Sequence, residues 1–200
     1  MPCYAFEGIR PVVHPTTFVH PTASLIGDVI VGPGCYIGAG ASLRGDFGRI
    51  VVEGDSSVQD NCTLHTGSGS DCVIGRGATV AHGSIVHGAT IGENALVGMN
   101  AVVLDEAVIG AESLIGALSL VKSDMRAAPR SLIAGNPAKV IRQMPAEAIV
   151  WKNDGDGEYQ RLARQSVADF EECEPLAEAE PGRRRVSGEA RAVRLKLGSN

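Results

Sequence analysis

The chain has 200 residues and a formal net charge of −5, from 23 acidic and 18 basic residues. This balance argues against nucleic acid or an anionic membrane as the main partner, and no apolar run approaches the roughly 18 residues of a transmembrane helix. Twenty-five glycines stand against only four Phe, three Tyr and one Trp. Such a composition predicts a narrow, repetitive interior filled by small and aliphatic side chains.

The amino-terminal segment Met1–Glu7 lacks the charged and apolar regions of a signal peptide. The five cysteines are an odd number and contain no Cys-x-x-Cys pair, which fits reduced thiols better than a disulfide framework. We therefore expect a cytoplasmic protein.

An aliphatic residue recurs every six positions along most of the chain, usually followed by Gly, which we expect to permit the turn. A strand has a period of 2 and a helix of 3.6, so six fits neither alone. It is typical of a left-handed parallel β-helix, a prism with three short strands per coil; an antiparallel sandwich would not keep one phase for so long. The repeated positions are Val19, Leu25, Val31, Ile37, Leu43, Val52, Val58, Leu64, Ile74, Val80, Val86, Ile91, Val97, Val103, Ile109, Ile115 and Val121.

Irregular repeats interrupt the pattern at three places. The repeats around 45–51 and 66–73 are longer than six residues, and the repeat 86–90 is one residue short. Past Val121 the pattern fades, and we expect the segment Ala134–Lys139, with its Gly and Pro, to be the exit from the prism.

Beyond the prism, helical stretches are expected near 146–152, opened by Pro145, and near 158–172. The fold class is thus mainly β, with a C-terminal α-helix. The predicted organisation is a β-helical metal-binding domain over 1–140, a helical segment over 141–175 and a charged, only partly ordered tail over 176–200.

The polar residues that interrupt the repeat fall into two columns. Three hexads form one coil, so residues three repeats apart stack at about 4.8 Å. Arg44, His65 and His87 are the second residues of three such hexads, and they are predicted to share one face. Asp60 and His82 are predicted to form a second column on the neighbouring face, at the same height.

The three histidines of these columns predict a metal site between subunits. His82 and His87 lie on different faces, so one chain would have difficulty bringing both to His65. A three-fold assembly would set the His82 face of one subunit against the His65/His87 column of the next. Three imidazoles with an open fourth position are the ligand set of a catalytic zinc. The alternative is a polar histidine cluster at a trimer seam.

Further polar residues flank this predicted site. Asp46 is close enough to pair with Arg44, and such a pair at a subunit seam could be purely structural. Gln59 and Asp60 approach from the neighbouring face, where either could orient the nucleophile or a histidine ligand.

These motifs resemble the γ-class carbonic anhydrase family over about residues 10–140. The residues that carry the resemblance are Arg44-Gly45-Asp46, Gln59-Asp60-Asn61, His65, His82 and His87. Members of that family bind zinc, iron or cobalt with three histidines across a trimer interface. The segments 19–23 and 43–52 and the tail 174–184 look like the subgroup of phenylacetic acid degradation and carnitine operon proteins.

The resemblance implies a homotrimeric Zn²⁺ enzyme, with Fe²⁺ or Co²⁺ as alternatives. A metal-bound hydroxide would hydrolyse CoA thioesters of phenylacetate catabolism or hydrate CO2 to bicarbonate. Arg44, Asp46, Gln59 and Asp60 would serve the reaction, and Tyr159 would be the tyrosine that family members place near the metal.

Phe47 departs from the family pattern, because it stands where the best-studied archaeal type has an active-site glutamate. The 66–73 loop also lacks the acidic residue proposed to shuttle protons there, and fast CO2 hydration needs such a shuttle. Two other functions stay open: a CoA-dependent acyltransferase that uses one histidine as general base, and a catalytically inactive trimeric scaffold. Three histidines in ligand register argue against the first.

Overall fold

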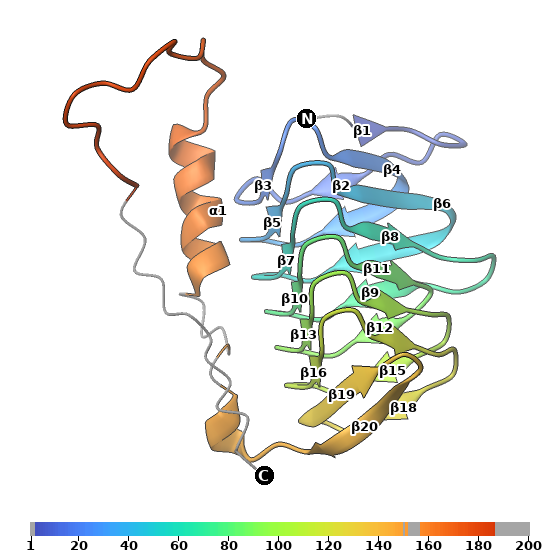
Figure 1. Ribbon diagram of the computed structural model, residues 1–200. Helices are drawn as coiled ribbons and strands as arrows, with labels where there is room; N and C mark the ends of the chain where they lie inside the picture. Colours follow the sequence, from blue (N-terminus) through green and yellow to red (C-terminus); the bar gives the residue numbers. More distant parts are fainter. Residues whose placement is uncertain (1–2, 150, 152–156, 187–200) are drawn as a thin grey trace.

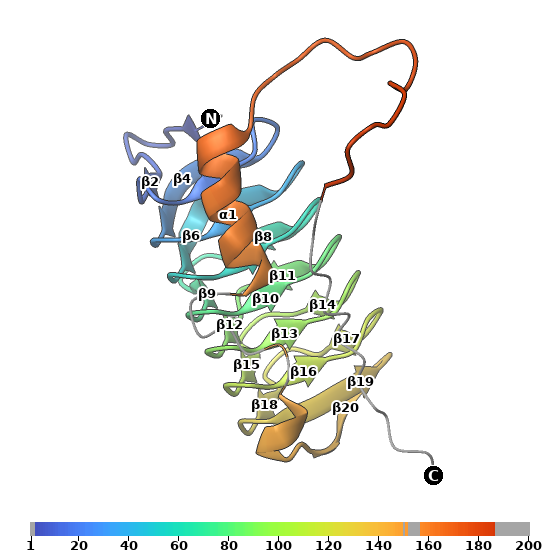
Figure 2. The same cartoon turned by 90° about the vertical axis from the view of Figure 1, so that its left-hand side faces the viewer.

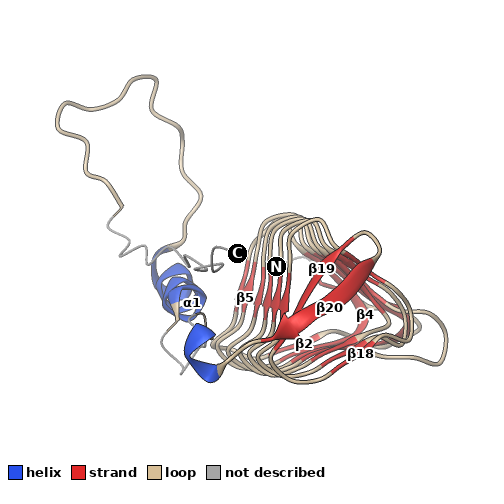
Figure 3. Cartoon of the chain, turned by 60° about the horizontal axis from the view of Figure 1, so that its bottom comes forward, coloured by secondary structure: helices blue, strands red, loops and turns tan. Residues whose placement is uncertain are grey.

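The computed structural model describes residues 3–149, 151 and 157–186, and it confirms the left-handed parallel β-helix (Figure 1). Viewed with its lower end forward, the coils superimpose into a rounded triangle (Figure 3). Short parallel strands stack coil upon coil on each of three sides, here called sides A, B and C. The prism thus has the three strands per coil that the period of six predicts.

Side A contains β1 (Cys3–Tyr4), β4 (Ser24–Val31), β6 (Ser42–Val52), β8 (Thr63–His65), β11 (Ile85–His87), β14 (Val102–Val103) and β17 (Leu120–Val121). Side B contains β2 (Val12–Val13), the later halves of β4 and β6, β9 (Cys72–Ile74), β12 (Thr90–Ile91), β15 (Val108–Ile109) and β18 (Arg126–Ala127). Side C contains β3 (Phe18–Val19), β5 (Tyr36–Ile37), β7 (Ser57–Val58), β10 (Thr79–Val80), β13 (Leu96–Val97), β16 (Leu114–Ile115), β19 (Ser131–Gly135) and β20 (Ala138–Gln143).

The interior is filled by the repeated aliphatic positions, all of which are buried from Val19 to Val121. Among the described residues, the core cluster consists of Val, Ile, Leu, Ala and Cys side chains, as the low aromatic content predicts. Backbone hydrogen bonds join successive coils; Gln59 N–H, for example, donates to the Val80 carbonyl at 2.9 Å. Burial and this ladder together fix which side chains stack.

The glycines that follow the aliphatic positions serve close packing between coils, not the turn. A Cβ on Gly98 would lie 2.5 Å from the backbone nitrogen of Ala117 in the next coil. The left-handed backbone angle belongs to Asn100, two residues further along, with φ of 55°. The expectation that these glycines supply the turn angles is therefore wrong.

Irregular repeats appear as loops on the prism. β4 and β6 pair from Gly27 with Gly45 and resume at Val29 with Ile50, so residues 46–49 lie opposite the single residue Asp28 and β6 has three extra residues. The second long repeat forms the connection from β8 to β9, and the short one forms the turn from β11 to β12. All three irregularities therefore lie close to the predicted site.

The prism extends beyond the point where the sequence pattern fades. Ile133 is buried and pairs with Ile115, so β19 continues side C past Val121. β20 then returns antiparallel to β19 and runs to Gln143. β20 thus runs across the predicted boundary at residue 140, and a terminal hairpin of this kind has no hexad period that could mark its end.

The C-terminal helices are shorter than predicted. The first is a single 3₁₀ turn, η1 (Ala146–Ala148), and the second is α1 (Glu158–Asp169). Residues 170–186 contain no helix or strand, and the rest of the predicted tail, 187–200, lies outside the described residues. No helix in the described part of the chain is long and apolar enough to cross a membrane.

α1 lies along side C, next to β3 and β5 (Figures 1 and 2). Its Tyr159 ring packs on Tyr36 with centroids 5.3 Å apart, and Phe170 packs on Phe18 at 5.2 Å. Gln160, on the same helix, donates a hydrogen bond to the carbonyl of Asp55. These contacts hold Tyr159 at a defined height on the prism.

Candidate metal centre

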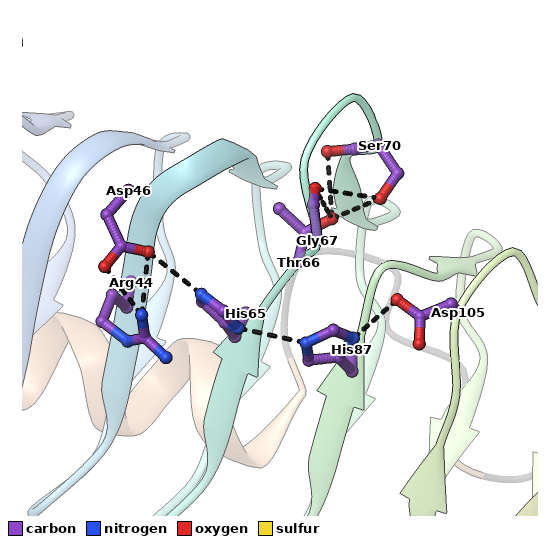
Figure 4. Close-up of polar contacts among 8 residues, drawn as sticks. All are labelled: Arg44, Asp46, His65, Thr66, Gly67, Ser70, His87 and Asp105. Atoms are coloured by element: carbon purple, nitrogen blue, oxygen red, sulfur yellow. Dashed lines mark hydrogen bonds and ion pairs between the residues drawn. The ribbon is translucent and has the colours of Figure 1, made fainter.

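The first predicted column forms as expected at the end of side A. In β8 and β11, His65 pairs directly with His87. Arg44 follows the paired residues of β6 one coil earlier, and Figure 4 shows the three side chains in a row. The repeat therefore brings together residues that lie 22 positions apart.

A chain of polar contacts runs along this column (Figure 4). Arg44 Nη1 donates to both carboxylate oxygens of Asp46, at 2.9 and 2.7 Å. Asp46 Oδ1 lies 3.0 Å from Nε2 of His65, and His65 Nδ1 lies 3.1 Å from Nε2 of His87. His87 Nδ1 lies 2.6 Å from Oδ1 of Asp105. A carboxylate thus bounds the histidine pair at each end.

Asp46 carries its negative charge in this arrangement. Desolvation raises the pKa of its carboxyl, but hydrogen bonds from Arg44 and His65 outweigh that effect and leave the pKa below its ordinary value. The predicted Arg44–Asp46 pair is therefore present, and Asp46 connects it to the first histidine.

The second column gathers around His82, at the corner between sides C and A. His82 Nδ1 lies 3.3 Å from Oδ2 of Asp60, whose Oδ1 accepts a hydrogen bond from the Ala39 N–H at 3.0 Å. Gln59 is buried, and its Oε1 accepts from the backbone N–H of His82 at 3.3 Å. Tyr159 completes the group, with its hydroxyl 3.4 Å from His82 Nε2.

Tyr159 stays protonated at physiological pH. Burial raises the pKa of its hydroxyl to about 12, and the nearby Tyr36 and the charge of Asp60 act in the same direction. The hydroxyl can therefore donate a hydrogen bond near His82, but it is a poor general base.

The two groups lie at opposite edges of side A. His82 precedes β11, and His87 ends it. Within the described residues of one chain, no three His, Cys, Asp or Glu side chains gather closely enough to hold a metal ion. Convergence of His65, His82 and His87 through a second subunit remains a prediction.

Asp105 contacts His87 and is not among the residues predicted from the sequence. It is the third residue of the hexad that begins at Val103, one coil beyond Gly88, and it is a charged exception to the repeat. The predicted column contains only the second residues of its hexads and ends at His87. Extending it by one coil and one residue would have found Asp105.

Two loops border the first column. Thr66 and Ser70 close the β8–β9 loop, with their hydroxyl oxygens 2.7 Å apart (Figure 4). Phe47, in the extra segment of β6, is 59% exposed and places its ring 5.7 Å from the ring of His65. The column is therefore bordered by a polar loop and by an aromatic ring.

Comparison with known proteins agrees with this architecture. A family model described as bacterial transferase hexapeptide (six repeats) matches residues 10–45 and 88–123. The chain is 48% identical over 188 residues to the carnitine operon protein CaiE of Escherichia coli O81 (strain ED1a), covering 94% of this chain and 96% of that protein.

Two solved structures are similar to this chain in both fold and sequence. A hexapeptide transferase family protein from Anaplasma phagocytophilum matches with a TM-score of 0.73 and 36% identity, covering 84% of this chain and 95% of that one. The BC4754 gene product of Bacillus cereus, a proposed acetyltransferase, matches with a TM-score of 0.74 and 33% identity, covering 82% and 92%. The chain therefore belongs to the hexapeptide-repeat family, in the subgroup of the carnitine operon protein CaiE.

Proposed function

We propose that this protein is a trimeric metalloenzyme that adds water to a CoA thioester or to CO2. One observation carries the proposal: each of the three histidines has one ring nitrogen beside a carboxylate. The pairs are His65 with Asp46, His82 with Asp60 and His87 with Asp105. A histidine that binds a metal nearly always donates its other ring N–H to a carboxylate, a backbone carbonyl or a water molecule.

The spacing of the first two histidines suits a shared ion. Two nitrogens at 2.0–2.1 Å from a tetrahedral zinc lie about 3.4 Å from each other. Nδ1 of His65 and Nε2 of His87 are 3.1 Å apart, and neither is the nitrogen that faces a carboxylate. These two residues fit a zinc, iron or cobalt ion that takes its third ligand from elsewhere.

The surface around His82 supports a neighbouring subunit as the source of that ligand. In the next two coils, the same corner presents Met99 and Leu118, which are 53% and 72% exposed. Large apolar side chains in one row are a common mark of a subunit contact. A second copy packed on this row would carry its His65/His87 column to His82.

The chemistry then divides among the chain's own residues. A zinc ion held by three imidazoles would supply a water molecule acidic enough to act as a nucleophile near neutral pH. In thioester hydrolysis the water oxygen bonds to the carbonyl carbon, the C–S bond breaks, and CoA leaves as its thiol. Arg44, fixed by Asp46, would face the negative charge that develops on the carbonyl oxygen. Gln59 holds the backbone at His82.

A CoA-dependent acyltransferase is the second candidate, because the matching family model is described as a transferase and the Bacillus cereus protein as a proposed acetyltransferase. In that case one histidine would take a proton from the acceptor, and no metal would be needed. Transfer of an acetyl group from acetyl-CoA to an amine or hydroxyl by metal-free protein would favour it.

Mixing two inactive variants tests the proposed function. His82→Ala keeps the His65/His87 column, and the double variant His65→Ala/His87→Ala keeps His82. Each alone should bind no metal in the site, and it should neither hydrolyse acyl-CoA nor hydrate CO2. When the two are unfolded and refolded together at equal amounts, about a quarter of the sites should be restored, as three-fold symmetry requires.

Three quantities are measured on each sample: metal content, the rate of CO2 hydration and the rate of CoA release from aromatic acyl-CoAs. Wild-type protein refolded in the same way is the control for recovery. Full activity in either variant alone would contradict the three-histidine site. Restoration of metal without turnover on any substrate would instead favour the scaffold.

A further inference from the structure

We propose that Asp105 is the positioning residue that aims Nε2 of His87 at the metal. The inference rests on the proposed metalloenzyme function and deepens it, because it assigns a task to a residue outside the predicted ligand set. Asp105 would touch neither metal nor substrate, and it would act through the imidazole of His87.

The contact itself fixes the ring. Oδ1 of Asp105 lies 2.6 Å from Nδ1 of His87, and a short distance of this kind marks a strong hydrogen bond to a charged acceptor. A histidine that donates its Nδ1–H to a carboxylate has its free lone pair on Nε2. That nitrogen is the one facing His65, 3.1 Å away. The carboxylate therefore selects both the tautomer and the direction of the ring.

The backbone makes room for this carboxylate at Gly88. A Cβ on Gly88 would lie 2.6 Å from Oδ1 of Asp105, and the residue has a left-handed φ of 55°. The carbonyl of Gly88 accepts a hydrogen bond from the N–H of Glu106 at 2.7 Å, which fixes Asp105 directly beneath the turn. The short repeat 86–90 thus lets the Asp105 side chain reach back to His87.

A second aspartate near Asp105 provides a control that separates the effect of negative charge from the effect of the contact with His87. Asp124 is exposed one coil further along, and its N–H donates to the Asp105 carbonyl at 3.0 Å. Its φ of 62° is a conformation that asparagine adopts readily. Asp124→Asn therefore removes one negative charge close to the site without disturbing His87, and it is the matched control.

The experiment is a Co²⁺ titration of the full-length protein, followed by the visible absorption of the bound ion. Asp105→Ala should weaken Co²⁺ binding about 10- to 100-fold, the usual loss for such a partner, and should change the absorption bands. Asp105→Asn keeps an oxygen that can accept the Nδ1–H, so it should recover most of the affinity. Asp124→Asn should bind as the wild type does. Circular dichroism of each variant verifies the fold.

The outcomes distinguish the inference from the function on which it rests. Wild-type binding that is lost in His87→Ala but unchanged in Asp105→Ala would overturn the role of Asp105 alone. Equal losses in Asp105→Ala and Asp124→Asn would reduce it to a general charge effect and also overturn it. Wild-type protein that binds no Co²⁺ would overturn the metal site and the inference together.

Discussion

The hydroxyl of Tyr159 lies 3.4 Å from Nε2 of His82, although 77 positions separate the two residues. Since Tyr159 is not a predicted ligand, Tyr159→Phe should leave metal content unchanged. Loss of one donor near the reacting carbonyl should lower kcat for thioester hydrolysis on the order of 10²-fold. Metal analysis and steady-state kinetics on an aromatic acyl-CoA check this.

Tyr36→Phe is the control for that prediction. The Tyr36 ring packs against Tyr159, and it should keep the helix in place without its hydroxyl. The free energy of unfolding of both single variants should lie within about 1 kcal/mol of the wild-type value. If the two lowered kcat equally, packing of α1 rather than the Tyr159 hydroxyl would be responsible.

Leu118 should affect folding and assembly in opposite directions. It is exposed and has a φ of 60°, which costs leucine roughly 1–2 kcal/mol relative to an ordinary backbone angle. Leu118→Asn should therefore stabilise the single chain. It should also weaken the trimer at least about tenfold, because about 1.5–3 kcal/mol of apolar burial is lost at each interface.

Analytical ultracentrifugation and urea unfolding of dilute protein measure the two effects of Leu118→Asn separately. Val12→Thr changes an exposed valine on side B and should alter neither. A Leu118 variant that assembles as the wild type does would place the subunit contact elsewhere on the prism.

Phe47 should set the balance between the two proposed substrates. Phe47→Glu introduces a proton acceptor close to His65. Such a group raises the reaction rate about 10²–10⁴-fold where proton transfer limits that rate. CO2 hydration should rise, and hydrolysis of aromatic acyl-CoAs should fall with the loss of the ring. Phe47→Leu keeps an apolar side chain and should not raise hydration. Equal rates in all three proteins would contradict a role in selection.

Buried thiols should make the protein less stable at alkaline pH. Burial raises the pKa of Cys35 and Cys62 to about 11 and that of Cys72 to about 12, against 9.0 for an ordinary thiol. Below pH 9 the thiols are protonated in both states, so their contribution is fully present. Above it the unfolded chain ionises first, and the free energy of unfolding should fall until the folded thiols ionise near pH 11–12.

Urea unfolding at neutral pH and at about pH 10 measures this loss. Cys72→Ala should show a smaller decrease between the two conditions. All five cysteines are free, but only Cys3 and Cys173 are exposed. A thiol reagent should thus titrate these two in the native protein and the others only after unfolding. Rapid reaction of all five would contradict the buried core.

The prism and its columns could be predicted from sequence because both depend on one period. A six-residue repeat specifies inward and outward positions and the partner one coil away. The pairing of His65 with His87 therefore followed from counting alone. The Arg44–Asp46 contact followed as well, since only one residue separates the two.

Other features depend on contacts that no period records. Tyr159 reaches His82 because aromatic rings place α1 on side C, and the length of the connection does not specify that height. Asp105 was missed because it leaves the column by one residue, through the short repeat at Gly88. The glycines that follow the aliphatic positions were assigned to the turn, because the sequence does not show how closely successive coils approach one another at these glycines.

The antiparallel strand β20 determines the direction in which copies of the protein can associate. A stack of parallel coils would otherwise end in a row of unpaired backbone N–H and C=O groups. Another copy of the chain could pair with such a row and extend the stack end to end. β20 runs antiparallel across that end, and its outer residues Lys139 and Arg142 are charged and exposed. On side C, β19 therefore has no free edge on which a further coil could pair. Association through the flanks of the prism, as in the proposed trimer, would instead give a finite ring of subunits whenever the rotation between neighbours closes.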